Sequence, residues 1–365
     1  MKTLIKIIRR EIAARGVLSF ARFMELALYC PVYGYYEAKK DNPGQRGDFY
    51  TSVSIGKLFG QLLAFQFAEW LEAEIGSQKS EVRIIEAGAH DGQLAGDILT
   101  WLQCNRPRLF GQIKYCIIEP SKRRQEWQQE VLHGFAPCVC WFADFEDLKL
   151  KTRNPKLSGI IFSNELLDAM PIRRFGWNAG KKEWFEWGVA VDGGKFVWAK
   201  IQNPQFAICN SQLETVLPDG YIIETSSTVE NWWRQAANVL GWGRLMTIDY
   251  GFTANEIFSP SQTSGTLRAF FHHHASNDLL ANVGEQDITA HVNFSAIQTV
   301  GESAGLTTES FLTQPQFLTR ILKKTLKDKT FGKWDANRTR QFQTLTHPDH
   351  LGRAFRVLIQ SRCSS

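Results

Sequence analysis

The sequence predicts an α/β protein whose core is a doubly wound parallel sheet. The first observation is an apolar, β-branched run at Val82–Ile85, which is typical of a buried parallel strand. The second is the segment after this run, where a turn rich in glycine leads to apolar residues at helical spacing from about Gln93. The third is recurrence, because similar apolar runs lie near Tyr115, Val139 and Ile160. Strands that alternate with helices in this way form parallel sheets.

The turn between the first of these strands and its helix is bracketed by Gly88 and Gly92. Such a turn places backbone N–H groups and the positive end of a helix at the carboxyl edge of the sheet. Its glycine spacing differs from the dinucleotide fingerprint. Glu86, directly before the turn, is more typical of sites for S-adenosylmethionine (SAM), whose ammonium and sulfonium are positively charged. Taken alone, the turn is equally consistent with an ordinary strand-to-helix connection.

Two further carboxylates come after neighbouring strands. Glu119 comes directly after the strand at Lys114–Ile118, where it can accept hydrogen bonds from both hydroxyls of a ribose. The alternative is a solvated carboxylate at the end of a strand. Asp144 lies beyond the third strand, where it either meets the amino group of an adenine or caps the next helix.

A polar cluster comes after the fourth strand, which we place at Gly159–Ser163. It consists of Asn164, Glu165 and Asp168, separated by apolar residues. Open α/β sheets bind ligands at this edge, so we expect the three side chains to have a functional role.

The N-terminal region predicts helices and a binding loop. The first sixteen residues are basic and amphipathic, which favours a native helix over a transit peptide because Glu11 is present and serine is scarce. Ser19 is the expected N-cap of the next helix. Asp48 and Tyr50 lie in a loop that mixes a carboxylate, an aromatic ring and hydroxyls, which indicates binding; the alternative is a series of caps for the helix at 55–74.

The segment after the fourth strand changes character. Residues 177–201 alternate apolar and polar side chains about an Asp-Gly-Gly turn, which predicts a β-hairpin. Trp184, Trp187 and Trp198 should pack across it. We expect this hairpin to be an insertion or cap, and the chain to return to the main unit at Tyr221–Glu224.

Composition excludes several classes of protein. The chain has 365 residues, of which 44% are hydrophobic, so it can bury a sizeable core. A net charge of +5 argues against a dedicated nucleic-acid binder, and no apolar run reaches transmembrane length. Seven cysteines without a CxxC pair suit reduced thiols. The run at 272–274 is three histidines without a carboxylate or cysteine at ligand spacing, so we expect no metal site.

Several segments together resemble the MidA-type class I methyltransferases, a family that includes the mitochondrial complex I assembly arginine methyltransferase. They occur in family order from about Phe20 to Leu358, and they are FMELALYCPVYGYY, RGDFYTS, EAGAHDGQLAGDIL, the EP after the second strand, SNELLDAMPIRRF, IDYG, GTLRAF with its histidines, and DITAHVNFSAI. The resemblance implies a Rossmann-like, seven-stranded, SAM-dependent methyltransferase sheet with N-terminal helices and an inserted β region. It also implies methylation of a protein arginine in the mitochondrial member.

One departure concerns His90, which stands where the family turn usually has a third glycine. An imidazole there either narrows the methionine side of the site or points outward. Two other functions stay open: a small-molecule methyltransferase with a narrower, more apolar acceptor pocket, and a non-catalytic assembly factor in which the turn at His90 weakens SAM binding.

We accordingly expect SAM as cofactor, a protein as substrate, no nucleic acid and no membrane span. The expected location is the cytoplasm, or the mitochondrial matrix for a eukaryotic source. The predicted parts are an N-terminal helical region with an active-site loop (1–78), a methyltransferase domain (79–176 and 219–365) and an inserted cap (177–218). The expected site residues are Glu86, Gly88, Gly92, Glu119 and Asp144 for the cofactor, Glu165, Asp168 and Asn164 for catalysis, and Asp48 and Tyr50 on the acceptor-side loop.

Overall fold

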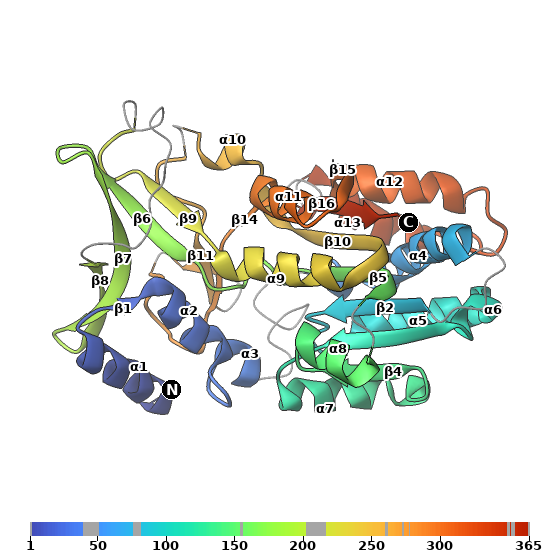
Figure 1. Cartoon of the computed structure of the whole chain (residues 1–365), viewed down its shortest axis with the longest axis horizontal. Coiled ribbons are helices and arrows are strands. Elements are labelled where there is room, and N and C mark those ends of the chain that lie inside the picture. Colours follow the sequence, from blue (N-terminus) through green and yellow to red (C-terminus); the bar gives the residue numbers. More distant parts are fainter. Residues whose placement is uncertain are drawn as a thin grey trace.

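The computed structural model describes residues 2–38, 51–75, 82–153, 156–201, 217–259, 262–271, 274–276, 278–348, 351 and 355–363. Its centre is an eight-stranded sheet with the order β15-β16-β10-β5-β2-β3-β4, and the short β14 pairs with β10 (Figure 1). These strands are β2 (Val82–Ala87), β3 (Ile113–Ile118), β4 (Val139–Phe142), β5 (Leu157–Asn164), β10 (Leu240–Phe252), β14 (Val292–Asn293), β15 (Thr307–Thr313) and β16 (Phe355–Arg362).

The pairing within this sheet confirms the predicted fold class. Strands β4, β3, β2, β5 and β10 are parallel neighbours, and β16 is antiparallel to both β10 and β15. Seven strands form the continuous path, as the resemblance implies, and β14 is an additional short strand. Five strands therefore end at one edge, and polar residues beyond them are brought together there.

Helices cover both faces of the sheet (Figure 1). Their apolar sides form two separate core clusters, one on each face. The first face carries α4 (Leu58–Ile75), α5 (Gln93–Asn105), α12 (Gln314–Thr325) and α13 (Ala336–Thr346), with α7 (Lys122–Val131) beside α5. The second face carries α8 (Phe145–Thr152), α9 (Ser227–Val239) and α11 (Phe294–Ser303).

The predicted hairpin is confirmed, but it belongs to a larger second sheet. Its strands are β7 (Glu183–Asp192) and β8 (Lys195–Ile201), and the rings of Trp187 and Trp198 meet across it at 6.2 Å between centroids. The same sheet contains β1 (Leu18–Ser19), β6 (Arg173–Asn178) and β9 (Ile222–Thr225), in the order β1-β7-β6-β9.

This pairing corrects one expectation. The segment Tyr221–Glu224 does not return to the main sheet, because β9 pairs with β6. The predicted boundaries at 177 and 219 therefore fall inside the second sheet. The partition of the chain into domains stays a prediction.

The N-terminal helices pack on this second sheet rather than on the main one (Figure 1). They are α1 (Lys2–Arg15), α2 (Phe20–Tyr29) and α3 (Tyr35–Ala38). The basic helix α1 buries Leu4, Ile8 and Ile12, and Ser19 caps α2 by accepting a hydrogen bond from the Arg22 amide, as predicted. The first part of the chain therefore brings α2 beside the inserted strands and α3 beside α2, whereas α4 packs on the main sheet.

The remaining elements are short connectors. A third sheet has the order β12-β11-β13. The bounds are β11 (Arg268–Phe271), β12 (His274–Ser276), β13 (Asp287–Thr289), α6 (Pro107–Phe110), α10 (Ala254–Ile257) and the 3-10 turns at Val53–Ile55 and His133–Phe135. Across the described part of the chain, no helix combines the length and the apolar character needed to span a bilayer.

Candidate functional site

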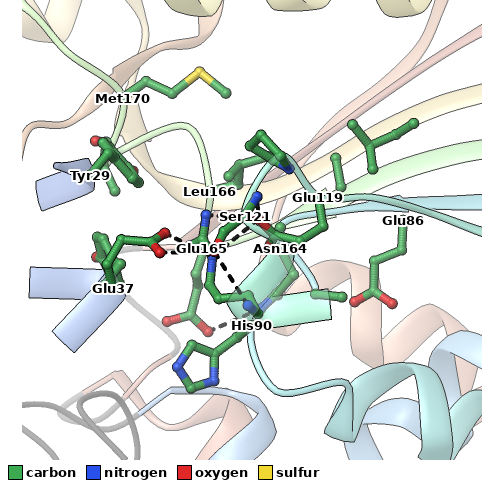
Figure 2. Close-up of a pocket in the computed structure, with 18 of the residues that line it drawn as sticks. Tyr29, Glu37, Glu86, His90, Glu119, Ser121, Asn164, Glu165, Leu166 and Met170 are labelled. Carbon is green, nitrogen blue, oxygen red and sulfur yellow. Dashed lines mark hydrogen bonds and ion pairs between the residues drawn. The ribbon is translucent and has the colours of Figure 1, made fainter. Parts of the chain in front are cut away.

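A cavity of about 1340 Å³ opens at the carboxyl edge of the parallel strands. Its walls come from the segments after β2, β3, β4 and β5, and from α2, α3 and α9. Figure 2 shows labelled side chains from α2, from α3 and from the ends of β2, β3 and β5 around one space. The volume exceeds that of an ordinary small-ligand pocket, about 300–1000 Å³, so the cavity has room for two molecules.

The glycine turn lies on the cavity wall, but its two glycines have different roles. Gly88 has φ +75° and lines the cavity, and a Cβ there would lie 2.7 Å from Leu166 Cδ1. Gly92 has φ +89° and is the N-cap of α5, where a Cβ would lie 3.3 Å from the Gln128 Cα on α7. Gly92 is not among the lining residues. Gly92 allows α5 and α7 to pack closely, and its contact with the cofactor stays a prediction.

Glu86 lies at the end of β2 and is buried on the cavity wall. It accepts a hydrogen bond of 2.7 Å from the Tyr115 hydroxyl. Burial raises the pKa of Glu86 to about 7, and the bond from Tyr115 opposes this shift. A positively charged ligand group beside Glu86 would favour its ionised form.

Glu119 is held in place by the segment that comes after it. Its Oε1 accepts a hydrogen bond of 2.8 Å from the Ser121 amide and pairs with Arg124 Nη2 at 2.9 Å. Its Oε2 has only a 3.4 Å contact from Gln128 among the described residues. Burial raises the pKa of Glu119, and the Arg124 charge opposes the shift. Oε2 is thus the oxygen with capacity left for a ligand hydroxyl.

Asp144 caps α8, because its Oδ1 accepts a hydrogen bond of 2.8 Å from the Asp147 amide. It also lines the cavity beside Phe145 and Trp232, whose ring centroids are 5.5 Å apart. The capping alternative is confirmed, and contact with an adenine stays a prediction.

Glu165 and Asn164 each carry one hydrogen-bond acceptor that is shielded from solvent. Glu165 Oε1 accepts bonds from the Ser52 amide (3.0 Å) and from Asn164 Nδ2 (3.1 Å). Within the described residues, Glu165 Oε2 and Asn164 Oδ1 have no hydrogen-bond partner, although both atoms are buried. Burial raises the pKa of Glu165 to about 8, against the bonds from Ser52 and Asn164. A buried acceptor without a donor costs about 1–3 kcal/mol, so each of these two oxygens has capacity for an N–H or O–H donor.

Asp168 is placed apart from Glu165 and Asn164. It is buried but does not line the cavity, because the chain turns after Leu166 and directs this side chain toward β10. There it shares a hydrogen bond with Asp249. Burial and the neighbouring charge of Asp249 raise the pKa of Asp168 well above its usual value. Asp168 therefore does not face an acceptor in the cavity.

Asp249 was missed as a site residue, although the sequence places it at the end of a buried strand. Its Oδ2 accepts bonds from the amides of Leu166 (3.1 Å) and Leu167 (2.8 Å). Burial raises the pKa of Asp249 to about 6. These bonds hold the turn after Glu165, which itself has φ +50°. Asp249 therefore positions Glu165 by holding the backbone of the turn that follows it.

The N-terminal helices add two further residues that sequence reasoning missed. Tyr29 on α2 lines the cavity, and its hydroxyl donates to the Ala169 carbonyl at 3.0 Å. Glu37 on α3 also lines the cavity (Figure 2). The motif FMELALYCPVYGYY contains Tyr29, but nothing in the sequence places it beside the fourth strand. The predicted loop residues Asp48 and Tyr50 lie outside the described residues.

His90 occupies a backbone conformation that favours glycine. Its φ is +46°, which explains why a glycine suits this position of the turn. Its side chain lines the cavity, with Nδ1 at 3.7 Å from Asp91 Oδ1. As for metals, no group of three or more potential ligands occurs in the ranges that the structure describes, and His272 and His273 lie outside them.

Comparison with known proteins defines the class. The family model described as "Putative S-adenosyl-L-methionine-dependent methyltransferase" matches residues 62–312, more than half of the chain. The chain belongs to this family. It is a SAM-dependent methyltransferase by family and fold, and SAM is its cofactor, as predicted.

Individual relatives agree with this assignment. A Burkholderia thailandensis protein, solved with S-adenosyl-homocysteine bound, is 30% identical with a TM-score of 0.83, over 99% of this chain and 92% of that protein. Two relatives are named "Protein arginine methyltransferase NDUFAF7, mitochondrial". The Danio rerio protein is 27% identical over 81% of this chain and 71% of its own length. The Xenopus tropicalis protein is 26% identical over 96% and 85%.

The raised carboxyl pKa values predict how stability depends on pH. Glu165 holds its proton up to a pKa of about 8 in the folded protein, well above the 4.5 of an ordinary glutamate. Its contribution to stability is therefore complete below about pH 4.5 and is lost as the pH rises through about 8. We expect Glu165→Gln, which cannot ionise, to gain stability relative to wild type over this range. Urea unfolding of the ligand-free proteins at several pH values measures this difference; a difference that does not change with pH would contradict it.

Proposed function

We propose that this chain transfers a methyl group from SAM to the guanidinium of an arginine side chain in a partner protein. The observation that carries the proposal is the pair of buried acceptors, Glu165 Oε2 and Asn164 Oδ1, that lack a donor among the described residues. A guanidinium is a planar donor with five N–H bonds and no acceptor, so it can bond both atoms at once. The names of the fish and frog relatives support the same acceptor.

The residues of the cavity fit the cofactor in three respects. Gly88 places the backbone of the turn on the cavity wall, and Glu119 Oε2 has capacity for a ribose hydroxyl. Glu86 is a buried carboxyl that a neighbouring positive charge would ionise. When bound, SAM would supply a methyl group that is carried on a sulfonium and is transferred by in-line displacement, with the thioether as the leaving group.

Glu165 has two tasks in this proposal. A bound guanidinium lowers the pKa of Glu165 from about 8 and so favours its carboxylate form. This carboxylate offsets the repulsion between two cations, which is about 4 kcal/mol at 4 Å for an effective dielectric constant near 20. It also accepts the proton that the guanidinium loses as the new N–C bond forms. The Ser52 amide holds Oε1, so Oε2 is the oxygen that receives this proton. Tyr29, Leu166 and Met170 wall this part of the cavity and limit the access of water (Figure 2).

The proposed location is the cytoplasm, or the mitochondrial matrix if the source is eukaryotic. The names of the curated relatives place those proteins in mitochondria and support only the second option. The proposed substrate is a protein, as expected from the sequence.

A labelling experiment tests the function. The purified protein is incubated with methyl-labelled SAM and a lysate from a strain that lacks it, and labelled proteins are digested for mass spectrometry. We expect the label on arginine side chains. Label confined to small molecules would support a small-molecule methyltransferase instead. Absence of SAM binding in calorimetry would support a non-catalytic assembly factor.

Gly88→Val is expected to abolish SAM binding. The Cβ would lie 2.7 Å from Leu166 Cδ1, so Leu166, which also lines the cavity, must shift, and a β-branched residue at φ +75° costs about 1–3 kcal/mol. Calorimetry with SAM and thermal unfolding separate loss of the site from loss of the fold. Gly134→Val is the control, since a Cβ there meets no described atom within 4 Å. Normal SAM binding by folded Gly88→Val would show that the turn does not touch the cofactor.

A further inference from the structure

Glu37 fastens the N-terminal helices to the segment that presents Glu119. It is a buried carboxylate, 7% exposed, near the end of α3. Its Oε2 accepts a hydrogen bond of 2.8 Å from the Ser121 hydroxyl, and its backbone carbonyl accepts one of 3.0 Å from Arg123 Nη1. Figure 2 shows the Glu37 carboxylate pointing from its helix toward Ser121. Two groups of one residue thus bind the start of α7, from a part of the chain more than eighty residues earlier.

Arg124 links Glu37 to the proposed ribose carboxylate. Its Nη2 lies 2.9 Å from Glu119 Oε1, and its Nε lies 3.7 Å from Glu37 Oε1. The guanidinium also lies 6.0 Å from the centroid of the Tyr29 ring on α2. Its side chain is only 12% exposed, so both ion pairs are weakly screened by solvent. The cation is therefore shared between a cofactor-side carboxylate and the wall formed by α2 and α3.

Glu37 also differs from the carboxylates that the reaction uses. Its hydrogen-bond and ion-pair partners here are Ser121, Arg123 and Arg124, which belong to the segment that holds Glu119. The wall that it fastens carries Tyr29, which faces the turn after Glu165 through its bond to Ala169. A shift of α3 would therefore move the acceptor side of the cavity, and it would reach Glu119 through Ser121 and Arg124.

We propose that Glu37 is a positioning residue that couples occupancy of the cofactor site to the seating of α2 and α3. A ligand hydroxyl on Glu119 Oε2 fixes this carboxylate, which fixes Arg124, and Arg124 with Ser121 then holds Glu37. By thermodynamic linkage, an acceptor that binds the wall of α2 and α3 strengthens cofactor binding by the same factor. The inference rests on the proposed cofactor position at Glu119 and is independent of the chemical nature of the acceptor.

Hydrogen exchange with and without S-adenosylhomocysteine tests the coupling. In the wild type, we expect this ligand to slow exchange of amides in residues 20–38 by about fivefold or more, the lower end of ordinary coupling. Glu37→Gln should still bind S-adenosylhomocysteine, with affinity reduced about tenfold at most, but should lose the slowing in 20–38. Amide exchange near Gly88 should still slow in Glu37→Gln. This slowing would show that the cofactor site of the variant is occupied.

Glu11→Gln is the matched control. Glu11 also pairs with an arginine, but it lies on α1, and its Oε1 is 2.8 Å from Nη2 of Arg22 on α2. This variant should keep the slowing in 20–38. If Glu37→Gln does not fold, Arg124→Lys replaces it, because a single ammonium cannot bridge both carboxylates as the guanidinium does.

The outcomes separate the inference from the proposed function. Equal slowing of amide exchange in residues 20–38 in ligand-saturated wild type and Glu37→Gln would overturn the coupling. A loss of this slowing in Glu11→Gln as large as that in Glu37→Gln would overturn it too. A wild type that binds S-adenosylhomocysteine without slowing 20–38 would overturn the coupling alone. A wild type that does not bind it would overturn the proposed cofactor position.

Discussion

Glu165→Gln is expected to slow methyl transfer by about 10²–10⁴-fold, the usual contribution of a positioned acid or base, while SAM affinity stays nearly unchanged. The variant keeps the shape of the side chain and loses the charge and the proton acceptor. Glu165 lies beyond β5, whereas the proposed cofactor contacts come after β2 and β3, so the two functions are separable. Single-turnover transfer and calorimetry with SAM measure the two quantities independently.

Asp168→Asn is the matched control for this prediction. Asp168 lies outside the cavity lining, and burial and Asp249 raise its pKa, which favours the neutral form that an amide resembles. We expect transfer close to that of the wild type. If Glu165→Gln retains full transfer, the arginine mechanism fails and a neutral acceptor becomes the better explanation. Loss of transfer in Asp168→Asn with a normal fold would show that this buried side chain acts in the reaction after all.

Glu119→Ala is expected to weaken SAM binding by tenfold or more. A charge-assisted hydrogen bond to a ribose hydroxyl is worth about 1.5–3 kcal/mol, and about 1.4 kcal/mol is tenfold in affinity. The change also removes the nearer carboxylate partner of Arg124, so the segment at the start of α7 loses an anchor. Calorimetry with SAM measures the affinity directly.

Glu146→Ala is the control for Glu119→Ala. Glu146 is an exposed carboxylate of α8 that pairs with Lys149 at 2.6 Å and does not line the cavity. Its removal should leave SAM affinity unchanged. Wild-type affinity in Glu119→Ala would mean that the ribose is bound elsewhere.

The sequence predicted the main sheet and much of its ligand-binding edge, for a physical reason. Buried parallel strands appear as continuous apolar runs, and their carboxyl ends meet at one edge of the sheet. Glu86, Glu119, Asn164 and Glu165 lie at the ends of such runs, and the structure places all four on the wall of one cavity. The cap on α8 by Asp144 and the hairpin about the Asp-Gly-Gly turn also depend on local signals.

What the sequence missed has a common cause, which is long-range geometry. The strand β9 pairs with β6 across a long connection, and no local pattern specifies that partner. Asp168 and Glu165 are three residues apart, yet the turn held by Asp249 directs them to different surroundings. Glu37 reaches its partners on α7 only through the packing of the N-terminal helices. Gly92 is a helix-packing position in the fold, which its local sequence does not indicate.

The central claim is that Glu165 and Asn164 receive the guanidinium of an arginine beside bound SAM. A crystal structure with S-adenosylhomocysteine and the acceptor peptide identified by labelling tests it most directly. The account predicts guanidinium nitrogens within hydrogen-bond distance of Glu165 Oε2 and Asn164 Oδ1, with the acceptor nitrogen facing the cofactor sulfur. A peptide bound with its labelled side chain away from these two atoms would contradict the claim.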